Sequence, residues 1–124
     1  MRGLLLQDFT TVLATVGGLT QSESGWLDLA GYRDVVFWLD VRETAASSQL
    51  LYQTAPAKDD SLFATIATIS PVSVGITTTA VLQDFAAVPV ARWIRWQLTG
   101  ANADIMFRIW VSANKPGRRN LSRQ

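Results

Sequence analysis

Runs of alternating apolar and polar residues, separated by turn-forming residues, limit what this chain can fold into more than any other feature. The clearest run is "RDVVFWLDVRE", residues 33–43. Because successive side chains of a β-strand point to opposite faces, one face of this strand is apolar and suited to a core. That face consists of Val35, Phe37, Leu39 and Val41. The other face is polar but contains a tryptophan, and it carries Asp34, Val36, Trp38, Asp40 and Arg42.

Nine segments are predicted as strands, and none of the chain has the spacing of an amphipathic helix. The segments are residues 4–9, 11–16, 25–29, 33–42, 48–54, 62–69, 76–83, 90–99 and 104–113. Eight or nine short strands with brief connections predict an all-β, single-domain antiparallel β-sandwich, with jelly-roll or Greek-key wiring. A chain of 124 residues suits one such domain. We expect the sandwich to span residues 1–114, with an N-terminal arm or edge strand at 1–10 and a basic tail at 115–124.

The last two predicted strands, 90–99 and 104–113, carry tryptophan on both faces. If residues 100–103 form a loop, the two strands pair as a hairpin whose inner face is uniformly apolar. The inner pairs are Leu98 with Ile105, Trp96 with Phe107, and Ile94 with Ile109. The outer pairs are Gln97 with Met106, Arg95 with Arg108, and Trp93 with Trp110. A tryptophan pair and an arginine pair would then be neighbours on a surface expected to face water.

Three interpretations of this outer face remain open. In the first, Trp93 and Trp110 form an intramolecular pair, with the arginines over the rings and with Asp34 and Asp40 as acidic neighbours. In the second, the face is a contact surface for another protein, because tryptophan, arginine and methionine are common at interfaces. The residues of that surface are Trp38, Trp93, Arg95, Met106, Arg108 and Trp110. In the third, exposed tryptophans stack against sugar rings of a carbohydrate.

The composition argues against catalysis and metal binding. The chain has no cysteine and no histidine, which removes disulfides, thiolate ligands and the commonest general base. Asp59 and Asp60 lack the pattern of a calcium loop and are expected in a solvated loop. Asp34 and Asp40 lie roughly 20 Å apart along one strand, too far to act as a catalytic pair. We therefore expect a protein that is not an enzyme and uses no cofactor or metal.

Charge is distributed unevenly, although the formal net charge is only +1. Residues 115–124, "KPGRRNLSRQ", contain Lys115, Arg118, Arg119 and Arg123 and no acid. We expect this tail to be solvated, to dock on a neighbouring subunit, or to contact nucleic acid. Nucleic-acid binding fits the tail least well, because no aromatic side chain is interleaved with the charges. At the other end, "GLLLQDF" is an edge strand or an arm lent to a neighbour. No apolar run suits a membrane span or a signal peptide, so synthesis in the cytoplasm is expected.

Together these features resemble the small β-sandwich or jelly-roll accessory proteins of tailed-bacteriophage virions, such as head decoration (cement), tail and connector proteins. The resemblance covers about residues 4–113 and rests on the strand-dense, low-charge composition and on "LLLQDF" and "KPGRRNLSRQ" as terminal arms.

The resemblance implies a structural protein of the virion that binds and stabilises a lattice. Its partners would be further copies of itself, as a homo-oligomer, and a major capsid or other virion protein. A tail, connector or receptor-binding component is an alternative. The expected contact residues are the six outer-face residues together with Lys115, Arg118 and Arg119. The stretches "RWIRWQLTG" and "DIMFRIWVS" also look like the closing strands of galactose-binding-like jelly-rolls, which implies a carbohydrate-binding module instead.

Overall fold

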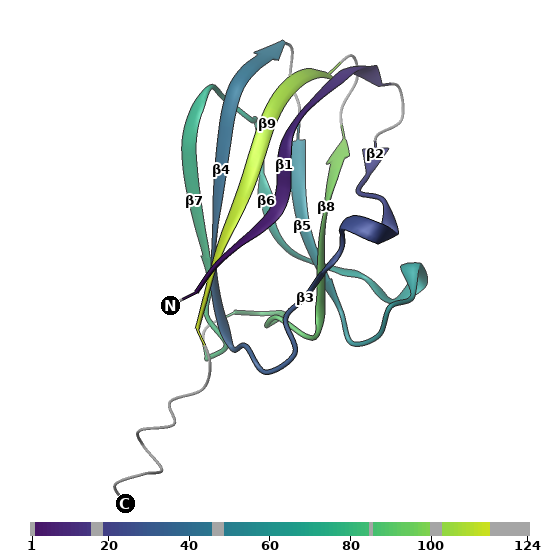
Figure 1. Ribbon diagram of the computed structural model, residues 1–124, viewed down its shortest axis with the longest axis vertical. Helices are drawn as coiled ribbons and strands as arrows, with labels where there is room; N and C mark the ends of the chain where they lie inside the picture. The colour runs from purple at the N-terminus through teal and green to yellow at the C-terminus, as the bar shows by residue number, and fades with distance from the viewer. Residues whose placement is uncertain (1, 16–18, 46–48, 85, 100–102, 115–124) are drawn as a thin grey trace, which may run out of the picture.

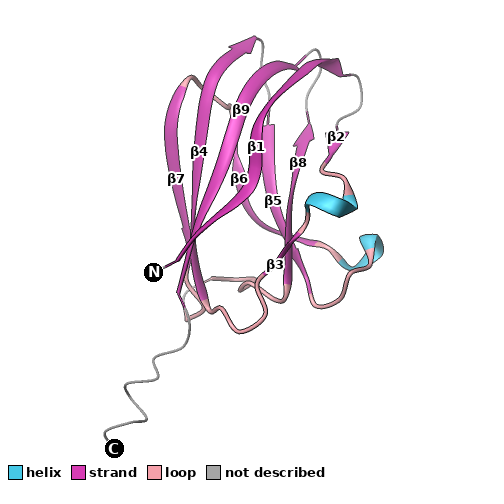
Figure 2. Ribbon diagram, viewed as in Figure 1, coloured by secondary structure: helices cyan, strands magenta, loops and turns pink. Residues whose placement is uncertain are grey.

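The protein is a sandwich of two antiparallel sheets, seen in a computed structural model that describes residues 2–15, 19–45, 49–84, 86–99 and 103–114 (Figures 1 and 2). Sheet A has the strand order β1 (Arg2–Thr15), β9 (Ala103–Asn114), β4 (Asp34–Ala45) and β7 (Gly75–Val81). Sheet B has the order β2 (Leu19–Thr20), β8 (Trp93–Thr99), β5 (Gln49–Ala55) and β6 (Ala64–Ile69), and β3 (Leu27–Asp28) also pairs with β8. The helical elements among the described residues are two 3₁₀ turns, η1 (Glu23–Gly25) and η2 (Asp60–Leu62).

The strand pairing is that of a jelly-roll. Strand β1 pairs with β9, β2 with β8, β4 with β7, and β5 with β6, so that the first half of the chain folds antiparallel against the second half. Rolling such a long hairpin into two layers produces two Greek keys. The predicted fold class, an antiparallel all-β sandwich with eight or nine strands, is confirmed, and the described residues form nine strands.

The core lies between the two sheets and includes the residues that alternation assigned to the inner faces of β4, β8 and β9. Val35, Phe37, Leu39 and Val41 of β4 are at most 1% exposed, as predicted. Phe37 of sheet A stacks on Tyr52 of sheet B, with ring centroids 3.9 Å apart and planes 10° apart. Such aromatic contacts between the layers fix how the two sheets sit on each other.

The predicted hairpin of the last two strands is wrong, because β8 belongs to sheet B and β9 to sheet A. Trp96 and Phe107 do meet, but edge to face across the core, with centroids 5.0 Å apart, instead of side by side in one sheet. Alternation identifies the inner face of each strand, and both arrangements bury the same residues. The pairing also avoids setting Arg95 opposite Arg108, since directly opposed like charges destabilise a sheet.

Two further boundaries differ from the prediction. The segments 4–9 and 11–16 form one strand, β1, whose three register shifts against β9 let a long edge strand bend around the sandwich. The segment 25–29 contains the end of η1 and the two-residue strand β3, and β2 was not predicted. The expected N-terminal arm or edge strand, 1–10, lies mostly within β1, an edge strand of sheet A.

Candidate functional site

The predicted site residues are divided between opposite faces of the sandwich. Trp93 and Arg95 lie on the outer face of sheet B, whereas Trp38, Arg108 and Trp110 lie on the outer face of sheet A. The half-buried Met106 belongs to the same side of β9 as Arg108 and Trp110. The predicted pairs of Trp93 with Trp110 and of Arg95 with Arg108 therefore do not exist. Lys115, Arg118 and Arg119 lie outside the described residues.

On sheet B, Arg95 is buried by the chain itself. Its side chain lies under the loop that contains η2, 3.9 Å from the centroid of the Phe63 ring and 5.3 Å from that of Trp26. Its Nε donates to Gln53 Oε1 at 2.8 Å, and its guanidinium pairs with Asp60. The acidic partner of Arg95 is thus Asp60, in a loop expected to be merely solvated, and not Asp34 or Asp40. Only 6% of Arg95 remains exposed.

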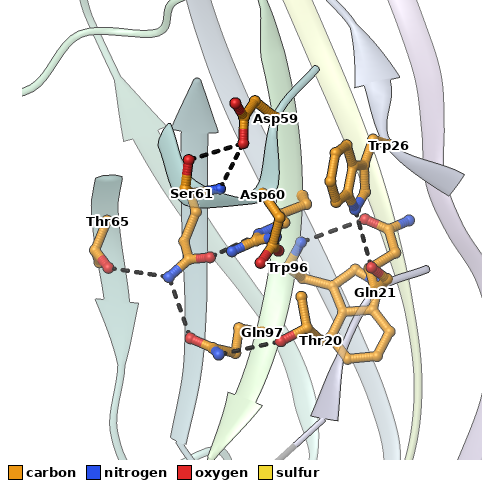
Figure 3. A network of polar contacts seen from close by, with 11 residues as sticks. Thr20, Gln21, Trp26, Asp59, Asp60, Ser61, Thr65, Trp96 and Gln97 are labelled. Atoms are coloured by element: carbon orange, nitrogen blue, oxygen red, sulfur yellow. Dashed lines mark hydrogen bonds and ion pairs between the residues drawn. The ribbon is translucent and has the colours of Figure 1, made fainter. Parts of the chain in front are cut away.

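A ladder of polar side chains crosses the outer face of sheet B beside Arg95. Gln53 Nε2 donates to Thr65 Oγ1 at 3.4 Å and to Gln97 Oε1 at 3.1 Å. Gln97 Nε2 in turn donates to Thr20 Oγ1 at 3.1 Å, so that the ladder joins β6, β5, β8 and β2 (Figure 3). Because these groups satisfy each other, this face has little polar capacity left for a ligand.

Trp93 is half-buried at the end of the same face. Lys58 Nζ lies 5.0 Å from its ring centroid, and the Arg92 guanidinium lies 5.4 Å away. Arg92 also forms a two-pronged hydrogen bond with Asp28, whose pKa is lowered mainly by this contact. Trp93 and Arg95 therefore contact other residues of this chain, but not the ones that the first interpretation named, because neither Trp110 nor Asp34 or Asp40 is among them.

The outer face of sheet A is different, because two tryptophans lie side by side in its middle. Trp38 of β4 is directly opposite Trp110 of β9, and each is 41% exposed. Register extends the row to Thr78 on β7 and Leu5 on β1, so that one row of side chains crosses all four strands. Trp38 Nε1 donates to Ser112 Oγ at 2.9 Å, which holds its indole in place.

A charged cluster adjoins the tryptophan row. Asp40 accepts hydrogen bonds from Arg42 Nε at 3.0 Å and from Arg108 Nη2 at 3.1 Å. The hydrogen bonds from Arg42, and to a smaller extent the one from Arg108, lower the pKa of Asp40, so this carboxylate carries a negative charge at neutral pH. Phe9 of β1 lies beneath both cations, with centroid distances of 5.0 Å to Arg42 and 4.4 Å to Arg108. Asp40 is thus an acidic neighbour of Arg108, as the first interpretation expected.

A β-bulge lies at the point where two arginines converge on one aspartate. The register of β4 against β9 shifts between Val41 and Glu43, so that Arg42 is the extra residue. Such a bulge re-aims a side chain without ending the strand. Alternation places Arg42 on the polar face, but nothing in the sequence pattern indicates Arg42 or Phe9 as a site residue. Only the order β1-β9-β4 brings these two side chains to Arg108.

Next to the tryptophans, the face is hollowed by an open pocket of about 310 Å³. Its lining includes Trp38, Trp110, Asp40, Arg108, Ile76 and Gly3. Gly3 has no side chain to fill this part of the hollow. The space beside it is open, since a Cβ at this position would meet no atom within 4 Å. Two ring systems, one carboxylate and one guanidinium are the chemical groups that this hollow offers to a ligand or partner.

Other kinds of site find no support in the described part of the chain. No group of three or more acidic, histidine or cysteine side chains that could hold a metal ion occurs among the described residues, where Asp59 instead caps η2 through the Ser61 N–H. None of their helices has the length and apolar character that crossing a bilayer demands. A comparison with protein-family models and one with curated protein sequences gave no match.

Proposed function

We propose that this protein is a non-enzymatic structural component of a multi-subunit assembly and that it docks on a partner protein through the outer face of sheet A. The observation that carries the proposal is the Trp38–Trp110 pair, two neighbouring indoles that are each 41% exposed in the middle of a sheet. A fully covered tryptophan buries on the order of 150–250 Å², so covering the part of each ring that is still exposed would add a hydrophobic gain.

The surroundings of the pair suit a protein interface. Binding energy at interfaces concentrates in central tryptophan and arginine side chains surrounded by groups that exclude water. Here the indoles are central, and the cluster of Asp40, Arg42 and Arg108 flanks them. A closed sandwich presents these side chains on regular strands, so little conformational entropy is lost on docking.

The setting that we propose is a phage virion, with the protein acting as a capsid decoration (cement) protein. The support is the resemblance in composition together with the jelly-roll architecture. In a lattice, each contact can be modest, because linked sites raise the overall affinity by about 10²–10⁴-fold. A basic tail with Lys115, Arg118 and Arg119 would add a second contact on a neighbouring subunit.

The test is rebinding to particles. Virions or other large particles that sediment with this protein from its natural source are stripped of it and supplied again with purified chain. Wild-type protein should rebind at a fixed stoichiometry, and the variant Trp38→Ala with Trp110→Ala should not, while circular dichroism shows that the variant is folded. Trp93→Ala is the matched control, because Trp93 lies on the opposite face. Equal rebinding by the double variant, or no association with any particle, contradicts the proposal.

A carbohydrate-binding module is the second candidate, and the hollow beside the tryptophans favours it. Its volume of about 310 Å³ is at the lower end of small-molecule sites, and it combines stacking surfaces with the hydrogen-bonding groups of Asp40 and Arg108. A glycan array decides between the candidates. A sugar-binding protein should give signals that Gly3→Glu abolishes, because Gly3 lines the hollow and a Cβ at this position meets no atom within 4 Å, so a larger side chain can be placed beside the ligand site. An array without signals removes this candidate.

A further inference from the structure

The described strands leave four edges in the sandwich, and three of them are interrupted or short. Strand β1 shifts register against β9 at three places, and β6 carries an extra residue, Ile66, in its pairing with β5. Strand β2 has only two residues. Bulges and short edge strands are the usual means by which proteins prevent other chains from pairing with their sheets.

The fourth edge, β7, has none of these features. Its seven residues pair with β4 in unbroken register, and among the described strands β4 is its only sheet partner. Alternate residues of an edge strand direct their N–H and C=O groups away from the sheet, where another strand can bind them. Ile76 is 67% exposed, and Val74, just before the strand, is 64% exposed.

Charge is also missing from the stretch of chain that forms this edge. The stretch from Ser61 to Gln83 contains no Asp, Glu, Lys or Arg, although such residues make up 17% of the chain. It includes both β6 and β7, which contact each other on one side of the sandwich. An apolar hollow of about 220 Å³, lined by residues that include Ile66, Val81 and Leu82, lies on the same side. Lysine and other charged side chains normally prevent an exposed edge strand from pairing with another chain, and β7 contains none.

We propose that β7 pairs antiparallel with β7 of a second copy of this chain, about a twofold axis at Thr78. The edge has no charge that a partner would have to complement, and a strand placed antiparallel to itself is self-complementary. In this register, Thr78 faces its own counterpart, and Ile76 faces Ala80 of the other copy. A large side chain then meets a small one, and a threonine pair, which is favourable across strands, occupies the centre.

The pairing joins two copies of sheet A into one continuous eight-stranded sheet. Both Trp38–Trp110 pairs then lie on the same outer surface, which doubles the area offered to a lattice. The role that we give this dimer, presenting two docking surfaces side by side, rests on the proposed function. The dimer itself is tested at Thr78 and not at the tryptophans. The variant Trp38→Ala with Trp110→Ala keeps β7 intact and should dimerise as the wild type does, so the two proposals fail in different experiments.

The first experiment measures oligomeric state by size-exclusion chromatography with light scattering, using the full chain over a range of concentrations. Wild type should form a dimer. Thr78→Lys sets two ammonium groups opposite each other and should raise the dissociation constant at least about tenfold. The matched control is Thr11→Lys, which puts the same change at an exposed threonine of the bulged edge strand β1 and should not alter dimerisation. Circular dichroism verifies that both variants fold.

The second experiment locates the axis by cross-linking. The chain has no cysteine, so Thr78→Cys introduces a single thiol. Directly opposed residues of antiparallel strands have Cα atoms about 4.5–5.5 Å apart, within the range of a disulfide. Thr78→Cys should therefore oxidise to a covalent dimer much faster than Thr11→Cys. Equal rates overturn the axis at Thr78. A wild-type chain that stays monomeric at its highest soluble concentration, or a Thr78→Lys chain that dimerises like wild type, overturns the proposal itself.

Discussion

Arg95 is a cation held beneath the surface of sheet B, and its neighbours explain how that is tolerated. Its ion-pair partner, Asp60, has a side chain that is 79% exposed, so solvent screens much of their attraction. More of the stabilisation comes from the Phe63 ring stacked on the guanidinium and from the hydrogen bond to Gln53. Arg95 thereby fastens the loop containing η2 to the face of the sheet.

Removing the Arg95 side chain should accordingly destabilise the fold. Arg95→Ala leaves Gln53 Oε1 without its donor and opens a space under Phe63, so we expect the free energy of unfolding to fall by about 2–3 kcal/mol. The matched control is Arg92→Ala, which removes an arginine whose side chain is 54% exposed from an ion pair and should cost below about 1 kcal/mol. Urea titration followed by circular dichroism measures both. Equal losses for the two variants would mean that Arg95 has no special structural role.

A substitution at Tyr52 should raise the free energy of unfolding, in contrast to Arg95→Ala. Its ring stacks on Phe37, and its buried hydroxyl finds no hydrogen-bond partner among the described residues. An unsatisfied buried hydroxyl destabilises a fold, so Tyr52→Phe should raise the free energy of unfolding by about 1 kcal/mol at neutral pH.

The same substitution predicts a pH dependence. Burial raises the pKa of Tyr52 above its ordinary value of 10.0, so the folded protein keeps the phenol neutral while the unfolded chain ionises it. The free energy of unfolding of the wild type should therefore fall above pH 10. Ionisation of Tyr52 in the unfolded chain contributes a slope that approaches about 1.4 kcal/mol per pH unit. Tyr52→Phe removes this contribution. Parallel denaturation curves of the two chains from pH 8 to pH 11 would show a constant difference if the idea is wrong.

At the level of the strands, alternation decides which side chains face inward but leaves the partner of each strand open. It assigned Val35, Phe37, Leu39 and Val41 to the core correctly. It could not tell whether β8 lies beside β9 or across the core from it, because Trp96 and Phe107 are in contact in either arrangement. Trp93 and Trp110 were consequently assigned to one surface, although they lie on opposite faces. The Trp38–Trp110 pair depends on β4 and β9 being neighbours, which no local pattern encodes.

The start of β7 depends on a backbone conformation that only glycine adopts readily. Gly75 has φ = +119°, whereas a Cβ added there would meet no atom within 4 Å. The cost of Gly75→Ala is therefore backbone strain alone, about 1–3 kcal/mol. Gly3→Ala is the control, because its Cβ also enters open space and no positive φ is involved, and we expect a change within about 0.5 kcal/mol. Thermal unfolding compares the two, and a Gly75→Ala chain as stable as Gly3→Ala contradicts the strain.

As a whole, the molecule has two unlike faces. The chain's own loops and a satisfied polar ladder cover the outer face of sheet B, where Trp26 is 9% exposed and Arg95 6%. The outer face of sheet A keeps Trp38 and Trp110 in contact with solvent. This asymmetry is the reason that we propose sheet A, and not sheet B, as the docking surface.

The asymmetry can be measured through tryptophan fluorescence, because the five tryptophans differ in their access to water. Trp38 and Trp110 are each 41% exposed, whereas Trp96 is 3% exposed in the core. Acrylamide should quench mainly the first two, so the variant Trp38→Phe with Trp110→Phe should lose most of the quenchable emission. Trp93→Phe, on the covered face, should lose little of it. Binding of a partner or lattice to sheet A should then protect the wild-type emission from acrylamide, and quenching that is as strong in the bound as in the free protein would place the docking surface elsewhere.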